Sequence, residues 1–165
     1  MESDTSRAEV QIEIEPIGVV RSARAEVRDD EWGGIECKII LDDRFEADAL
    51  TGIEDFSHAE ILFFFDRVDP DKVVAGARHP RNNQAWPAVG IFAQRGKNRP
   101  NRIGSTIVRV IRREGRALHV AELDAVDGTP VLDIKPVMRE FLPRGAVHQP
   151  SWSSELMERY WERGG

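Results

Sequence analysis

Apolar and polar residues alternate with a period of two in short stretches along most of the chain, which is typical of strands that bury one face. The longest apolar run, residues 61–65, has only the length of a strand. Glu114-Gly115 and Asp127-Gly128 are turn-forming pairs between such runs. The pattern predicts strands at 11–15, 35–41, 59–65, 73–75, 89–93, 104–112, 117–123 and 131–134. Residues 16–22 either end the first of these strands or extend it.

Helical patterns are confined to two short stretches. Asp42-Asp43 precedes apolar residues that reach Leu50, which predicts a short helix ending at Gly52, and residues 153–161 predict a helix near the C-terminus. Many short strands with turns between them predict a mainly β domain, either a barrel or a sandwich. We expect three parts: a flexible tail at 1–10, the β domain at 11–140 and a partly helical extension at 141–165.

Composition fits one ordinary globular domain of 165 residues with 41% hydrophobic side chains. No apolar run approaches the roughly 18 residues of a membrane span. The start of the chain, Met1-Glu2-Ser3-Asp4, is acidic and unlike a secretory signal. The single cysteine, Cys37, lies in an apolar stretch and is predicted to be a buried, inert thiol. We therefore expect a cytoplasmic protein without a membrane partner.

The distribution of charge says more than the net charge of −6. Residues 76–116 hold ten Lys or Arg and one acidic residue, a net +9, which leaves −15 for the rest of the chain. An acidic body with one basic segment indicates a face that binds phosphates. An uneven scatter of charge in a highly charged chain is the alternative.

Common catalytic signatures are absent from the sequence. There is no GxGxxG, no P-loop, no CxxC, no HExxH and no GxSxG, so a Rossmann nucleotide site and a serine-hydrolase elbow have no support. The four histidines lack the spacing of metal ligands, and we expect no metal site. We assign no catalytic residue.

Two loops carry the unusual chemistry. Residues 90–104 (GIFAQRGKNRPNRIG) bring three arginines and a lysine onto a turn stiffened by Pro100. Guanidinium groups bind phosphates and carboxylates in two-pronged fashion, and a stiff loop loses little entropy on binding. Residues 123–136 (LDAVDGTPVLDIKP) place three aspartates within ten residues, which can hold a cationic ligand or a ribose hydroxyl. A solvated basic loop and turn-stabilising aspartates are the alternatives.

Together these loops resemble the TrmO/TsaA-like (YaeB-like) family of SAM-dependent tRNA adenosine methyltransferases. The family patterns are close to GxFATRSPxRPNPIG and LDxxDGTPxxDIKP. Two further stretches are similar to its opening motifs: residues 17–22 (IGVVRS) to IGxIRS, and residues 52–58 (GIEDFSH) to GLExFSH. The resemblance covers residues 16–136 in four ordered motifs.

The resemblance implies a single β-barrel with short helices, a homodimer, and SAM (S-adenosyl-L-methionine) bound near the dimer interface. It implies N6-methylation of a threonylcarbamoyl-modified adenosine next to the tRNA anticodon, and no DNA partner. Carried over residue by residue, the SAM-binding set is Arg28, Asp29, Asp30, His58, Ala59, Arg95, Ile103, Asp124, Ala125, Val126 and Asp127. The residues expected to bind the substrate are Lys97, Arg99 and Asn101.

Some departures keep alternatives open. Gly96-Lys97 replaces the family's Ser-Pro, and Arg102 replaces the proline before Ile-Gly. Bacterial family members carry a further C-terminal domain, which we do not expect in this chain of 165 residues. Another RNA or a small molecule as methyl acceptor therefore stays open, as does a non-catalytic SAM-binding module. Arg95 and Arg99 can bind either the methionyl carboxylate or RNA phosphates, and His58 can instead be a core histidine.

Overall fold

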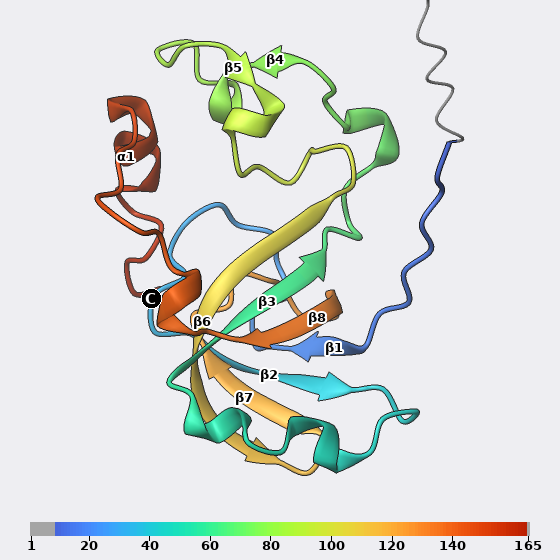
Figure 1. Cartoon of the computed structure of the whole chain (residues 1–165). Helices are drawn as coiled ribbons and strands as arrows, with labels where there is room; N and C mark the ends of the chain where they lie inside the picture. Colours follow the sequence, from blue (N-terminus) through green and yellow to red (C-terminus); the bar gives the residue numbers. More distant parts are fainter. Residues whose placement is uncertain (1–8, 165) are drawn as a thin grey trace, which may run out of the picture.

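Six strands form a closed barrel in the computed structural model, which describes residues 9–164 (Figure 1). The order around the barrel is β1-β2-β7-β6-β3-β8, and every neighbouring pair is antiparallel. Closure removes the sheet edges that an open sheet would expose. The expected single barrel is confirmed. Its strands are β1 (Gly18–Arg21), β2 (Glu36–Leu41), β3 (His58–Phe64), β6 (Ile103–Glu114), β7 (Ala117–Ala121) and β8 (Pro130–Pro136).

Alternating residues of the strands fill the barrel interior. On β3, Ile61 and Phe63 are buried, and on β2 Cys37 and Ile39 are buried. Gly104 on β6 leaves room for the Phe63 ring, because a Cβ there would lie 2.5 Å from two ring carbons. Burial raises the pKa of the Cys37 thiol to about 12. The thiol therefore stays protonated at neutral pH, as expected for an inert buried cysteine.

The inward and outward positions of the barrel wall differ in their expected contribution to stability. Ile61 is completely buried, whereas Ile107 on the adjacent strand is 48% exposed. We expect Ile61→Val to lower the free energy of unfolding by about 1 kcal/mol, because it removes one buried methylene. Ile107→Val is the matched control and should change it by less than about 0.5 kcal/mol. Urea denaturation measures both values, and equal losses would contradict the assigned orientation of the strands.

A small lobe, residues 70–102, is inserted between β3 and β6 (Figure 1). It contains a two-stranded antiparallel sheet and three single-turn 3-10 helices. The side chain of Gln94 is buried and donates to the carbonyls of Arg78 and Val89, at 3.0 and 2.8 Å, and so fastens the small sheet to the loop that follows it. The lobe's elements are β4 (Ala77–Arg78), β5 (Val89–Gly90), η3 (Pro70–Lys72), η4 (Pro80–Asn82) and η5 (Ile91–Ala93).

The remaining helices are short. The C-terminal segment, residues 151–164, begins with the only α-helix of the described residues, α1 (Ser151–Met157). In Figure 1, α1 stands beside the lobe. Within residues 9–164 no helix has the length and apolar character needed to span a membrane. The other single-turn helices are η1 (Ala47–Leu50), η2 (Ile53–Asp55) and η6 (Arg139–Phe141).

Several predicted elements differ from the structure outside the barrel. The strand predicted at 11–15 is wrong: these residues pair with no strand, and Ile12 and Ile14 are 75% and 56% exposed. The edge strand predicted at 73–75 lies instead at Ala77–Arg78, and the strand predicted at 89–93 ends at Gly90. The helix predicted after Asp43 is a single turn. Residues 1–8 of the predicted tail lie outside the described residues.

Candidate functional site

Asp124 is fixed by the two apolar residues that flank it. The segment between β7 and β8 places Leu123 and Ala125 in the core, where they are 1% and 4% exposed. Because neighbouring residues of an extended chain point to opposite sides, Asp124 is turned away from that core. Glu122 precedes it with a left-handed backbone, φ 68°, which turns the chain out of β7.

Two hydroxyl groups hold the Asp124 carboxylate. Thr106 Oγ1, from β6, donates to one oxygen and Tyr160 Oη, from the C-terminal segment, donates to the other. Burial, with the Asp124 charge beside it, raises the pKa of the Tyr160 hydroxyl above its usual range. Tyr160 therefore remains a proton donor at neutral pH, and its hydrogen bond to the carboxylate is charge-assisted.

Some of the arginines of the basic loop, residues 94–102, make hydrogen bonds within the protein that stabilise the loop. Arg99 Nη1 donates to the carbonyl of Gln94 at 2.7 Å. Arg102 donates to the carbonyl of Val68 at 3.0 Å, and its guanidinium stacks 4.6 Å from the centre of the Phe64 ring. Arg95 instead reaches β6, where Nη2 donates to the carbonyl of Ser105 at 2.5 Å. Lys97 is half-buried and Asn101 is exposed in the same loop.

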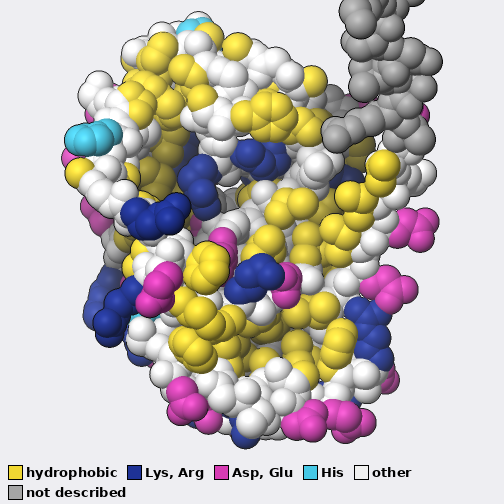
Figure 2. All heavy atoms as spheres, in the orientation of Figure 1, with side chains coloured by type: hydrophobic (Ala, Val, Ile, Leu, Met, Phe, Trp, Pro, Cys, Tyr) yellow, Lys and Arg dark blue, Asp and Glu magenta, His cyan; other side chains and the backbone are white. Residues whose placement is uncertain are grey.

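The basic loop and the aspartate segment meet on β6. Arg95 binds Ser105, and Asp124 binds the next residue, Thr106. Arg81 of the lobe and Arg95 both act on Tyr160, whose pKa they lower against the larger effect of burial. Figure 2 shows Lys and Arg side chains around a hollow between the lobe, α1 and the barrel. We call Asp124, Thr106, Tyr160 and Arg95 the Asp124 site.

The loop at 28–30 joins this site through Arg81. The guanidinium of Arg81 makes a two-pronged ion pair with Asp30, at 2.9 and 3.1 Å, and also donates to the carbonyl of Asp29 at 3.4 Å. Arg28 is exposed, and its ion-pair partners among residues 9–164 are acidic neighbours of its own loop at 3.7–3.9 Å. Asp29 and Asp30 therefore belong to the surroundings of the Asp124 site, whereas Arg28 lies at its margin.

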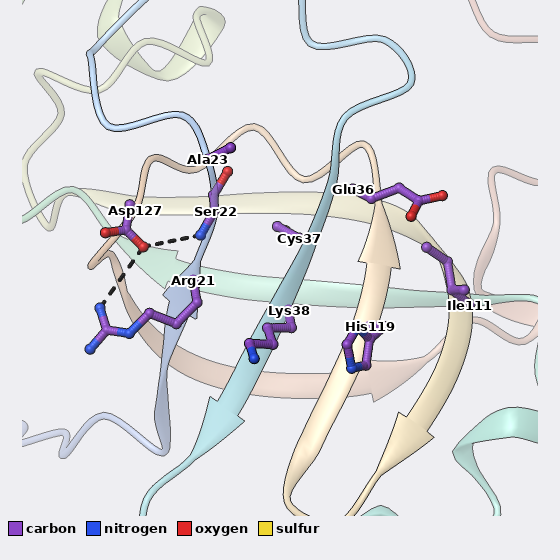
Figure 3. A pocket seen from close by; sticks show the side chains of 9 residues that line it. All are labelled: Arg21, Ser22, Ala23, Glu36, Cys37, Lys38, Ile111, His119 and Asp127. Carbon is purple, nitrogen blue, oxygen red and sulfur yellow. Dashed lines mark hydrogen bonds and ion pairs between the residues drawn. The ribbon is translucent and has the colours of Figure 1, made fainter.

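Asp127 faces a different place from Asp124. Its carboxylate accepts a hydrogen bond from the Ser22 amide at 3.0 Å and lies 3.9 Å from Arg21. These residues border a pocket of about 460 Å³ on the outer face of β1, β2 and β7, together with Lys38 and His119 (Figure 3). Val126 accepts a hydrogen bond from Thr129 Oγ1 at 2.7 Å, which tightens the turn.

His58 and Ile103 lie far from each other in one chain. His58 pairs with Arg109, whereas Ile103 pairs with Phe64 at the opposite end of β3, about 20 Å away at the usual rise per residue. His58 is exposed and its Nδ1 lies 2.7 Å from Ser57 Oγ, so it is not a core histidine. Ala59 is completely buried in the barrel. A single chain therefore places His58 and Ile103 beside opposite ends of β3.

Three residues at or beside the Asp124 site were not expected from the sequence. Arg81 and Thr106 carried no motif, and Tyr160 lay in a segment predicted only as helix. The one available signal was that Tyr160 is the single tyrosine of the chain, next to Trp161 in an otherwise charged stretch. Within the described residues, no group of three or more His, Cys, Asp or Glu side chains is arranged to hold a metal ion.

The family model for the tRNA-methyltransferase O N-terminal domain matches residues 28–141. The chain belongs to this family. The matched range includes the basic loop, the aspartate segment and the loop at 28–30, and it ends before the C-terminal segment. The resemblance seen in the four motifs is thereby confirmed.

Relatives and solved structures agree with that membership. The human tRNA (adenine(37)-N6)-methyltransferase is 41% identical over 102 residues, which are 62% of this chain and 23% of that protein. An S-adenosyl-L-methionine-binding protein of Archaeoglobus fulgidus is 34% identical over 129 residues, 74% of this chain and 86% of that protein. The crystal structure of TrmO from Pseudomonas aeruginosa aligns with a TM-score of 0.66 at 31% identity, covering 84% of this chain and 61% of that one. The chain thus spans less than a quarter of its human relative.

Proposed function

We propose that this protein is a SAM-dependent methyltransferase that methylates N6 of a (threonylcarbamoyl)adenosine next to the anticodon of a tRNA. The observation that carries the proposal is the meeting of the basic loop and the aspartate segment on adjacent residues of β6. The names of the human and Pseudomonas relatives support the reaction, and that of the archaeal relative supports the cofactor.

The residues at the Asp124 site fit the charged groups of SAM. SAM supplies an activated methyl group when it is bound, and it carries an amino group, a carboxylate and ribose hydroxyls. The carboxylate of Asp124 suits the amino and hydroxyl groups, and Arg95 suits the carboxylate of SAM. Nε of Arg78, whose guanidinium lies beside Gly96, is buried without a hydrogen-bond partner among the described residues. An anion bound next to the basic loop would satisfy it.

The chain's own residues have two tasks in such a reaction. They must align the acceptor amine, and they must exclude water from it. The protonated hydroxyl of Tyr160 cannot accept the proton that the amine releases, because its pKa lies above the usual range. A carboxylate of the aspartate segment or a backbone carbonyl remains for that task, and we assign none.

The basic segment supports an RNA acceptor. Lys97, Arg99 and Asn101 lie on the loop next to Arg95, where they can contact phosphates and base or ribose edges of a tRNA. We propose residues 11–140 as the SAM-binding domain and residues 141–165 as an extension to it. We further propose a cytoplasmic homodimer with no DNA partner, and His58 as a residue of its SAM site.

Replacing Arg95 tests the contribution of the basic loop. We expect Arg95→Ala to weaken SAM binding about tenfold or more, because a guanidinium that pairs with a carboxylate contributes about 1.5–3 kcal/mol. Calorimetric titration with SAM and with its demethylated product SAH measures the dissociation constants, and wild type should bind one molecule per subunit. Arg112→Ala, an exposed arginine at the far end of β6, is the control. Undiminished binding by Arg95→Ala would remove this residue from the site.

An activity assay tests the reaction itself. The protein is incubated with SAM and with tRNA from cells that lack this protein, and formation of SAH and of N6-methylated adenosine is followed. Both products are expected in equal amounts. SAH formed without a methylated tRNA adenosine would point to another acceptor.

A non-catalytic SAM-binding module is the second candidate. It is favoured by the archaeal relative, which is named only as a SAM-binding protein and is covered over 86% of its length. This candidate predicts tight SAM binding but no SAH with any tRNA pool.

A further inference from the structure

The C-terminal segment is docked along the loop at 31–33 by backbone hydrogen bonds. The amides of Glu31, Trp32 and Gly33 donate to the carbonyls of Arg159, Tyr160 and Glu162, at 3.1, 2.8 and 2.9 Å. The contact is close, since a Cβ on Gly33 would lie 2.0 Å from the Trp161 carbonyl oxygen. The segment is thus a fixed part of the molecule, although it lies beyond the residues that the family model matches.

This docking delivers one side chain to the Asp124 site. Tyr160 is partly buried, packs edge-on against the Trp161 ring with 5.0 Å between centroids, and donates its hydroxyl to Asp124. Arg81 and Arg95 are the charged residues of the lobe that act on it. The hydroxyl of Tyr160 therefore lies among the groups that we assign to SAM binding.

Asp124 depends on both of its donors for its orientation. Thr106 binds one carboxylate oxygen from the barrel wall, and Tyr160 binds the other from the C-terminal segment. With one donor removed, the carboxylate can turn about its side-chain bonds, and part of the preorganisation for a ligand is lost. Two donors hold the carboxylate in one orientation.

We propose that Tyr160 is a positioning residue that orients Asp124 for SAM, so that the C-terminal segment completes the SAM site. The inference rests on the proposed function. It gives a role to a segment for which neither the motifs nor the family match provides one. Tyr160 acts through Asp124 and need not touch SAM itself.

Tyr160→Phe tests the inference, because it removes the hydroxyl and keeps the ring. Calorimetry with SAH is expected to give about tenfold weaker binding, because the Asp124 carboxylate is no longer preorganised for the ligand. Glu155→Ala is the matched control: Glu155 lies on the same segment and accepts a hydrogen bond from Trp86 Nε1 at 2.8 Å, but it does not contact Asp124. The dissociation constant of SAH for Glu155→Ala should equal that for wild type. Wild-type affinity in Tyr160→Phe would overturn the inference while leaving the proposed function intact.

A double-variant cycle separates positioning from a merely structural role. Thr106→Val removes the other donor and should also weaken SAH binding about tenfold. If both hydroxyls act through one carboxylate, the loss of SAH affinity in the double variant should be smaller than the product of the two single losses, by about threefold or more. Losses that multiply independently would overturn the inference. Absence of SAH binding in the wild type would instead refute the proposed function, which keeps the two failures distinct.

Discussion

Replacing Asp124 with asparagine is expected to weaken the binding of SAM and SAH about 100-fold. The carboxylate accepts hydrogen bonds from Thr106 on one oxygen and from Tyr160 on the other. An asparagine offers one oxygen and an amide nitrogen, so one hydroxyl would face a donor, and the negative charge would also be lost. Competition calorimetry extends the measurement to dissociation constants in this range.

Asp133 provides the control for Asp124→Asn. It belongs to the same sequence motif, but on β8 it is partly exposed and pairs with Lys135 at 2.9 Å. Asp133→Asn should leave SAH binding within about twofold of wild type, because exposed ion pairs contribute little. Similar losses in both variants would show that the motif acts through overall charge and not through a site at Asp124.

Replacing Gly33 with valine is expected to release the C-terminal segment from the barrel. A Cβ at this position would lie 2.0 Å from the Trp161 carbonyl oxygen and 2.9 Å from that of Glu162, and backbone atoms cannot move aside as a flexible side chain can. Hydrogen exchange should become at least about tenfold faster at the amides of Glu31 and Trp32, since these lose their hydrogen bonds to the segment. SAH binding should weaken at least as much as in Tyr160→Phe.

Gly76→Ala is the control for the valine variant. A Cβ on Gly76 would have no heavy atom within 4 Å, so neither hydrogen exchange in the C-terminal segment nor SAH binding should change. If Gly33→Val kept wild-type exchange across residues 151–164, the close contact between the segment and the loop at 31–33 would be contradicted.

The barrel was predictable because its strands bury one face. Alternation or short apolar runs marked the long strands, and the runs at 35–41, 59–65 and 104–112 lie within two residues of β2, β3 and β6. The same alternation misled at 11–15, where no neighbouring strand pairs with the segment and the apolar side chains stay exposed. Alternation shows which residues can form a strand with one buried face. Whether that strand pairs depends on a second strand that is distant in the sequence.

The site was only partly predictable for a related reason. The motifs identified Arg95 and Asp124, and the structure brings both to β6. Tyr160 lies 36 residues from Asp124 along the chain and reaches it only through the docking of the C-terminal segment. Such a contact leaves no periodic or local signal. The inclusion of His58 and Ile103 in the same set came from the family resemblance, and a single chain keeps them at opposite ends of β3.

A crystal structure of the protein with bound SAH shows directly whether the cofactor occupies the Asp124 site. SAH is expected to lie in the hollow between the lobe and the barrel, with polar groups within hydrogen-bonding distance of Arg95 and Asp124. SAH bound elsewhere, for example in the outer pocket beside Lys38 and His119 without contact to Arg95, would contradict it.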